Sequence, residues 1–214
     1  MNKPLKTIEA EDHRLLDELD RGFDEVRRRA AEELVCAEGC SECCVGPIPI
    51  TRLDAWRLER GMRSLWVERP AVATAIVADA HRALAVMKDG FPGEFESGRL
   101  AADEAALDRF LEKHRTLACP VLDKATGSCR LYAARPVSCR TYGPPLAFEG
   151  QPAPHCDLCF REAAAQTIES CRWSPDPAAR EQRLLRRLGV APGDDWETLI
   201  AHAVAGSSEM ERPE

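Results

Sequence analysis

The sequence lacks long apolar runs, a surplus of positive charge and a secretory signal. No apolar run approaches the ~20 residues that a helix needs to span a bilayer, so we expect no membrane partner. The 214 residues carry a formal net charge of −7, and phosphate contacts need a basic surface, so we expect no nucleic-acid partner. No apolar segment follows the lysines of residues 1–6, which predicts a cytoplasmic protein.

The chain also has no glycine-rich nucleotide-binding loop and no recognisable pairing of a nucleophile with a general base. Internal repeats and low-complexity segments are absent as well. Tyrosine is scarce, with only Tyr132 and Tyr142. Hydrophobic residues make up 44% of the chain and charged residues 30%, which is typical of a globular protein with its own core.

Cysteine, in contrast, is abundant, with ten residues in the chain. In a small secreted domain this number would indicate disulfides. In a cytosolic protein, grouped cysteines more often bind metal or carry out redox chemistry. The chain also has several helix-forming segments and needs no disulfides to fold. We therefore interpret the cysteines as thiolates and not as disulfides.

Apolar residues recur at steps of three and four along most of the chain, which predicts a mainly α fold. A long amphipathic helix is predicted over 8–34, and its apolar stripe serves either core packing or contact with a protein partner, including a coiled-coil dimer. Thr51 is the predicted N-cap of the next helix, which Gly61 is expected to end. Further helices are predicted from Pro70 to about Met87 and over about 101–115, 160–171, 177–188 and 194–205.

One stretch is typical of β-structure, with short strands at 120–123 and 128–132 and a turn between them. A short helix is predicted to begin at Arg135–Pro136 and to carry Cys139. The expected fold is a helical domain around a cysteine-cluster metal site with one short β-hairpin. Four parts are predicted: an N-terminal helix (1–34), a cysteine-cluster domain (35–173) with a helical insert at about 51–118, C-terminal helices (174–206) and a disordered tail (207–214).

Nine of the cysteines lie in three groups beside turn residues. A metal site needs several thiolates within ~2.3 Å of one ion, and a Cys-x2-Cys turn directs two of them to one point. Cys40-Ser-Glu-Cys43 and Cys156-Asp-Leu-Cys159 are such turns, while Cys119 and Cys129 face each other across the predicted hairpin. The predicted metal ligands are Cys36, Cys40, Cys43, Cys44, Cys119, Cys129, Cys139, Cys156 and Cys159.

Two details of spacing leave the kind of metal centre open. Adjacent side chains on an extended chain point apart, so Cys43 and Cys44 serve either two nearby sites or different irons of a cluster. Cys36-x3-Cys40-x2-Cys43 has the spacing of the iron–sulfur motif of radical SAM enzymes, but no alternating strand–helix series follows it here. Cys171 lies within a helical pattern and is interpreted as a core residue.

Three segments together resemble the motif of a known family: Cys40-Ser-Glu-Cys43-Cys44, Cys119-Pro-Val-Leu-Asp123 and Cys129-Arg-Leu-Tyr132-Ala-Ala-Arg135-Pro-Val-Ser-Cys139-Arg140-Thr-Tyr142. The chain is similar here to the CxxCxxCC family of cysteine-cluster proteins, described as zinc- or iron-chelating. The likeness spans about 36–159. It departs from the family pattern in having three residues, not two, between its first two cysteines.

The resemblance implies zinc or iron as the bound metal, held either as an ion or in an iron–sulfur cluster. We expect the first cysteine group, 40–44, to lie near the second, 119–139, despite the insert between them. Four thiolates around a divalent ion leave net negative charge, which Arg135 and Arg140 are expected to offset. The hydroxyls of Tyr132 and Tyr142 are expected to complete the surroundings of the site.

Three functions remain compatible with these observations. The first is metal binding with a structural, storage or delivery role. The second is an iron–sulfur-dependent enzyme, because a flagellin lysine-methylase branch contains a similar cysteine motif and implies protein-lysine methyl transfer. The third is an interaction module that zinc holds folded.

Overall fold

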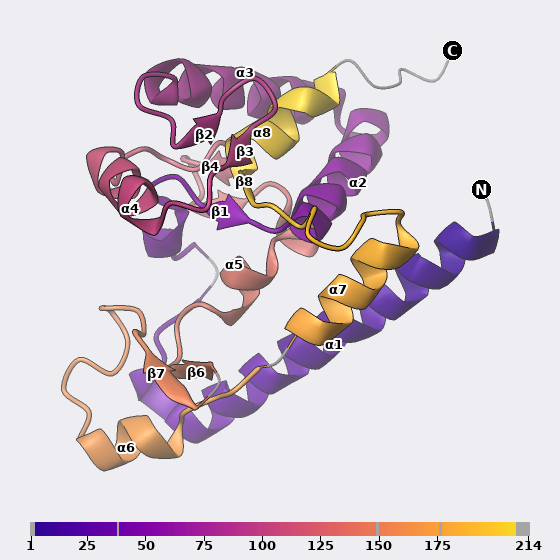
Figure 1. Cartoon of the computed structure of the whole chain (residues 1–214). Coiled ribbons are helices and arrows are strands. Elements are labelled where there is room, and N and C mark those ends of the chain that lie inside the picture. The colour runs from indigo at the N-terminus through magenta and orange to yellow at the C-terminus, as the bar shows by residue number, and fades with distance from the viewer. Residues whose placement is uncertain (1–2, 38, 149, 176, 209–214) are drawn as a thin grey trace. The chain divides into compact units, whose positions relative to one another are not determined.

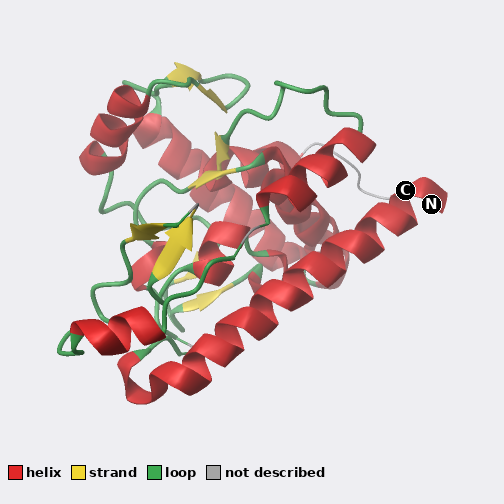
Figure 2. Ribbon diagram, turned by 60° about the horizontal axis from the view of Figure 1, so that its bottom comes forward, coloured by secondary structure: helices red, strands yellow, loops and turns green. Residues whose placement is uncertain are grey.

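The computed structural model describes residues 3–37, 39–148, 150–175 and 177–208. Helices dominate this part of the chain, as the sequence predicts (Figures 1 and 2). The strands, none longer than three residues, form four two-stranded antiparallel sheets. The sequence predicts one hairpin and therefore too few strand pairs. Segments this short show too little alternation of apolar and polar residues to be recognised in the sequence.

The chain divides into two compact units, each made of two segments. Unit 1 comprises Met1–Glu38 and Val137–Pro192, and unit 2 comprises Gly39–Pro136 and Gly193–Glu214. The four-part division expected from the sequence stays a prediction. Of the predicted tail 207–214, residues 207 and 208 belong to a 3-10 turn (Gly206–Ser208), and residues 209–214 lie outside the described residues.

Unit 1 is organised along one long helix, α1 (Lys3–Ala30), against which α5 and α7 pack (Figure 1). The predicted stripe of α1 is buried, including Leu16, Leu19 and Val26, so its apolar residues serve core packing within this unit. The helix ends before Ala31, whose φ of 48° lies in the left-handed region. The other elements of unit 1 are the 3-10 turn Ala31–Glu33, α5 (Val137–Thr141), β6 (Leu146–Phe148), β7 (Gln151–Ala153), α6 (Ala165–Ser170) and α7 (Ala178–Arg187).

Unit 2 has a core of three helices, α2 (Arg52–Glu68), α3 (Pro70–Met87) and α8 (Ile200–Ala205). Thr51 caps α2 as predicted, since its hydroxyl accepts a hydrogen bond of 3.1 Å from the Asp54 amide. The remaining elements are the 3-10 turns Glu42–Cys44 and Tyr132–Ala134, helix α4 (Glu104–Lys113) and the pairs β1 (Pro49–Ile50) with β8 (Thr198–Leu199), β2 (Gly93–Glu94) with β3 (Arg99–Leu100) and β4 (Leu122–Asp123) with β5 (Ser128–Cys129).

Two predicted helices are much shorter than expected. The helix predicted over 194–205 is wrong in its first half, because Thr198 pairs with Ile50 between β8 and β1, and the tertiary pairing overrides the helical pattern. The helix predicted over 160–171 begins only at Ala165. Phe160 has a φ of 56°, and this left-handed conformation interrupts a helix.

Among the described helices, α3 has the length and hydropathy of a membrane span, contrary to the expectation from the sequence. This is weak evidence for a span, because the core helix of a globular protein passes the same test. Here Ile76 and Ala80 are fully buried, and the helix packs against α2 and α8.

The prediction that Gly61 ends α2 is wrong, because this residue lies inside the helix. A Cβ at Gly61 would lie 2.6 Å from the Cβ of Ala134 and 3.4 Å from a methyl group of Leu131. The missing side chain therefore lets the segment that follows Cys129 pack closely on the helix. This contact places the cysteine hairpin β4–β5 relative to α2.

We predict that Gly61→Val destabilises the protein by about 1–3 kcal/mol, because the added methyl groups overpack the contact with Ala134. Ser64→Val, at an exposed position of the same helix, is the matched control and should change the free energy of unfolding by no more than about 0.5 kcal/mol. Denaturant unfolding followed by circular dichroism measures both. Equal effects of the two substitutions would contradict the role given to Gly61.

Candidate metal centre

In unit 2, a short antiparallel pairing brings the first cysteine group to the second. The carbonyl of Cys44 accepts a 2.8 Å hydrogen bond from the amide of Cys119, and the amide of Gly46 donates one of 2.6 Å to Leu117. Val45 and Ala118 form the bridge between them. The pairing closes the chain across the insert, as the sequence analysis expected for these residues.

The hairpin β4–β5 adds Cys129 to this arrangement, with Cys129 opposite Leu122. Its turn passes close to the loop before Cys40. A Cβ at Gly127 would lie 2.4 Å from the carbonyl oxygen of Gly39, and both glycines have positive φ. Only glycine fits such an approach of two backbones. The loop that carries Cys40 is therefore seated on the hairpin turn.

Backbone amides are directed at two of the sulfur atoms. The amide of Val121 donates to the sulfur of Cys119, and the amide of Leu131 donates to the sulfur of Cys129. Each donor lies two residues after its cysteine, so the two halves of the hairpin present their sulfurs in the same way. A donor of this kind stabilises a thiolate relative to a thiol, and therefore favours metal binding.

The four thiols of this group differ in how readily they lose their protons. A hydrogen bond from Cys44 lowers the pKa of Cys43 to about 7. The same bond, together with burial and the neighbouring sulfurs of Cys119 and Cys129, raises the pKa of Cys44. Burial raises the pKa of Cys119 to about 12 and also raises the pKa of Cys129. The mutual electrostatic effects indicate that the four sulfurs lie within reach of one another.

Two arginines supply positive charge to this group. The guanidinium of Arg135 lies 3.9 Å from the centre of the Tyr132 ring. Its charge adds to the hydrogen bond from Cys44 in lowering the pKa of Cys43, and it partly offsets the burial that raises the pKa of Cys129. Arg130, which the sequence analysis missed, donates bonds of 2.6 Å to both the Asp79 carboxylate and the Pro120 carbonyl. It therefore ties the hairpin to α3, and its position directly after Cys129 was the available signal.

The end of the same sequence motif belongs to unit 1. Cys139 is half-buried on α5, and the buried Arg140 forms an ion pair of 2.6 Å with Asp20 of α1. Arg140 thus anchors α5 to α1 and is not a surface residue. Tyr142 is exposed, as is Tyr132 in unit 2. The role of Cys139 as a ligand stays a prediction.

Unit 1 gathers the remaining predicted ligands. The sulfur of Cys36 lies 3.8 Å from that of Cys159, and Cys156 acts on the same sulfur. Cys171 is fully buried in the same hydrophobic cluster, as expected for a core residue. None of the chain's cysteines forms a disulfide.

The donor chemistry fits zinc or iron, because both metals accept thiolate ligands and the sulfurs receive amide donors. In the residues that the structure describes, however, no three histidine, cysteine or acidic side chains already surround a common point. The sulfurs would therefore have to move closer together to hold an ion. The residues that would hold it in unit 2 are Cys43, Cys44, Cys119 and Cys129.

A comparison with protein families agrees with this chemistry. The chain matches the model of the CxxCxxCC family, described as a putative zinc- or iron-chelating domain, over residues 35–157, which is more than half of its length. The chain belongs to this family. No curated protein and no solved structure matches it. The CxxCxxCC match contains every predicted ligand except Cys159.

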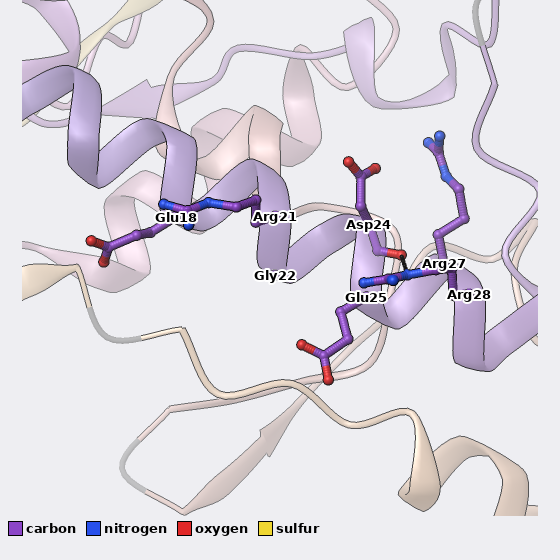
Figure 3. A pocket seen from close by; sticks show the side chains of 7 residues that line it. All are labelled: Glu18, Arg21, Gly22, Asp24, Glu25, Arg27 and Arg28. Atoms are coloured by element: carbon purple, nitrogen blue, oxygen red, sulfur yellow. Dashed lines mark hydrogen bonds between the residues drawn. The ribbon is translucent and has the colours of Figure 1, made fainter.

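An open hollow lies on α1 in unit 1 (Figure 3). Acidic and basic side chains both line it. Its lining residues are Glu18, Arg21, Gly22, Asp24, Glu25, Arg27 and Arg28.

Metal binding by the four thiols of unit 2 should release protons in a number that depends on pH. At pH 8 Cys43 is mostly ionised and the other three are protonated, so about three protons should leave per zinc ion. At pH 6 Cys43 is protonated too, and the number should rise to about four. Calorimetric titrations in buffers of different ionisation enthalpy measure this number.

The control for this prediction is Cys43→Ser, in which the number of released protons should not depend on pH between 6 and 8. A number that is constant with pH in the wild-type protein would contradict the assignment of Cys43 as the readily ionised thiol.

Proposed function

We propose that this member of the CxxCxxCC family holds a zinc or ferrous ion through Cys43, Cys44, Cys119 and Cys129, with storage or delivery of the metal as its role. The observation that carries the proposal is the pair of amide donors from Val121 and Leu131 to the sulfurs of Cys119 and Cys129. Such donors stabilise a thiolate more than a neutral thiol, whose sulfur is only a weak acceptor.

Several residues around the thiols control where protons and charge lie in the site. Cys44 keeps its proton in a hydrogen bond to Cys43 until both are needed as ligands. Arg135 lies on Tyr132 and offsets the negative charge of the thiolates. Arg130 fixes the hairpin through Asp79 and Pro120. A bound divalent ion supplies the positive charge that burial of several thiolates requires.

An iron–sulfur cluster is the second candidate, and the adjacency of Cys43 and Cys44 favours it. Two neighbouring thiolates fit two irons of one cluster more readily than one tetrahedral ion. Iron–sulfur-linked methyl transfer to a protein lysine is the enzymatic form of this candidate. Broad visible absorption of anaerobically purified protein would favour the cluster, and colourless protein with stoichiometric zinc would exclude it.

The third candidate is an interaction module that zinc holds folded, with α1 as its contact to a protein partner. The buried stripe of α1 supports it least, because α5 and α7 already cover apolar residues of that helix. We further propose a cytoplasmic location, since unoxidised thiols need a reducing compartment. We propose neither a nucleic acid nor a membrane as a partner.

Elemental analysis tests the proposed function directly. The protein, purified without oxygen or chelators, should carry zinc or iron, and Cys119→Ser/Cys129→Ser should lose the ion of unit 2. Cys171→Ala is the matched control, because it removes a thiol from the core and should retain the wild-type metal content. Full metal content in Cys119→Ser/Cys129→Ser would overturn the proposal.

Arg135→Lys should weaken metal binding roughly tenfold, because lysine keeps the charge but loses the planar group that lies on Tyr132. Competition with a chelator of known affinity measures the change. Arg115→Lys, at an exposed position of the same unit, is the control and should bind as the wild type does. Equal metal affinities of both variants would show that the guanidinium of Arg135 does not contribute to metal binding.

A further inference from the structure

The thiols of unit 1 form a cluster that the proposed function does not use. Cys36 and Cys159 are separated by 123 positions in the sequence, yet their sulfurs lie 3.8 Å apart. Cys156 hydrogen bonds to the sulfur of Cys159 and raises its pKa in addition to the effect of burial. In unit 1 the Cys159 sulfur therefore contacts thiols from two distant segments, although the three sulfurs do not yet surround a common point among the described residues.

The separation of the two sulfurs is informative. Two ligands of a tetrahedral ion with metal–sulfur bonds of ~2.3 Å are about 3.8 Å apart. The distance between the sulfurs of Cys36 and Cys159 has this value, which is also that of a hydrogen-bonding contact between two thiols. A disulfide would instead need the sulfurs to close to ~2.05 Å and would leave Cys156 without a role.

The backbone around Cys159 has the form of a metal-binding turn. The amide of Cys159 donates to the carbonyl of Cys156 over 2.9 Å, which closes the Cys-x2-Cys turn. Phe160 then adopts a left-handed conformation and donates a 2.9 Å bond to Glu33. This bond brings the segment before Cys36 alongside, and the amide of Val35 donates to the sulfur of Cys159. A strained residue held in this way is a common feature of functional sites.

Space for the cluster depends on Gly143. A Cβ at this position would lie 2.7 Å from the sulfur of Cys36, and the φ of Gly143 is 128°. The carbonyl of Gly143 accepts a 3.2 Å bond from the amide of Cys156. The glycine therefore lies against both segments and leaves the sulfur of Cys36 the room it occupies.

Burial of the cluster is uneven. Cys156 and Cys159 are 5% and 1% exposed and pack with Val26 and Leu34, while Cys36 is half-buried. The cluster can thus be reached from solvent at Cys36. Arg27 donates a 3.3 Å bond to the Cys36 carbonyl and places a positive charge beside it.

We propose that Cys36, Cys156 and Cys159 form a second binding site of this protein, within unit 1, for one soft divalent ion such as Zn²⁺. Thiolates are the ligands that such ions prefer, and three of them leave a fourth position for water or an exchanging ligand. Cys171 is buried in the same cluster but contacts the hydroxyl of Ser170 at 3.9 Å, and it stays a packing residue. The inference goes beyond the proposed function, which concerns the thiols of unit 2.

The test is a titration of the reduced, metal-free full-length chain with Co²⁺, followed by thiolate-to-cobalt charge-transfer absorption. Cys36→Ser/Cys159→Ser should lose one equivalent of bound Co²⁺ and keep the rest. Cys119→Ser/Cys129→Ser should keep the equivalent of unit 1. Cys171→Ser is the matched control and should bind as the wild type does. Circular dichroism checks that each variant is folded.

If the double variant does not fold, Cys36→Ser alone tests the inference, because this position is half-buried. This single substitution should lower the affinity for the Co²⁺ ion of unit 1 at least about tenfold. Wild-type stoichiometry and affinity in the variants at Cys36 would overturn the inference and leave the proposed function standing. Loss of every equivalent from both double variants, or a Cys36–Cys159 disulfide in anaerobically purified protein, would also overturn it. Full retention in Cys119→Ser/Cys129→Ser alone would instead overturn the proposed function.

Discussion

The pairing of Cys44 with Cys119 is the contact on which the arrangement in unit 2 depends. Their 2.8 Å backbone bond, with the bridge between Val45 and Ala118 beside it, joins two segments that the whole helical insert separates. Closing so long a loop costs conformational entropy, which is offset by the packing of the insert helices α2 and α3 against each other and against α8. The helical core therefore helps to hold the two cysteine groups near one another.

Much of this could be predicted from the sequence, because long helices carry a strong periodic signal. The stripe of α1, the Thr51 cap and the hairpin at Cys129 are recognisable from local patterns alone. The resemblance of the motif added the family and its description as zinc- or iron-chelating. What local patterns cannot give is a contact whose partner is distant in the chain, such as the pairing of Thr198 with Ile50.

The same limit applies to the candidate site. Gly61 has the local appearance of a helix end, and only the position of Ala134 explains why it lies within a helix. Phe160 gives no sign in the sequence that its φ is positive. The sequence grouped the cysteines by spacing, whereas the structure divides the motif at Pro136 between two units. Cys36 and Cys159 belong to the same unit, and the spacing of the cysteines in the sequence does not predict their contact.

Burial and backbone hydrogen bonds act in opposite directions on the pKa of Cys119 and Cys129, and their balance suits a chelating site. Burial raises the pKa of Cys119 to about 12, so the thiol stays protonated to a higher pH than an ordinary cysteine, and the thiolate is the reactive form. The amide of Val121 and the charge of Arg130 act against burial without overcoming it. The site is thus held short of ionisation until a cation supplies the remaining stabilisation. A thiol held in this state is oxidised less readily than an exposed cysteine in the absence of metal. It still loses its proton when a metal ion binds.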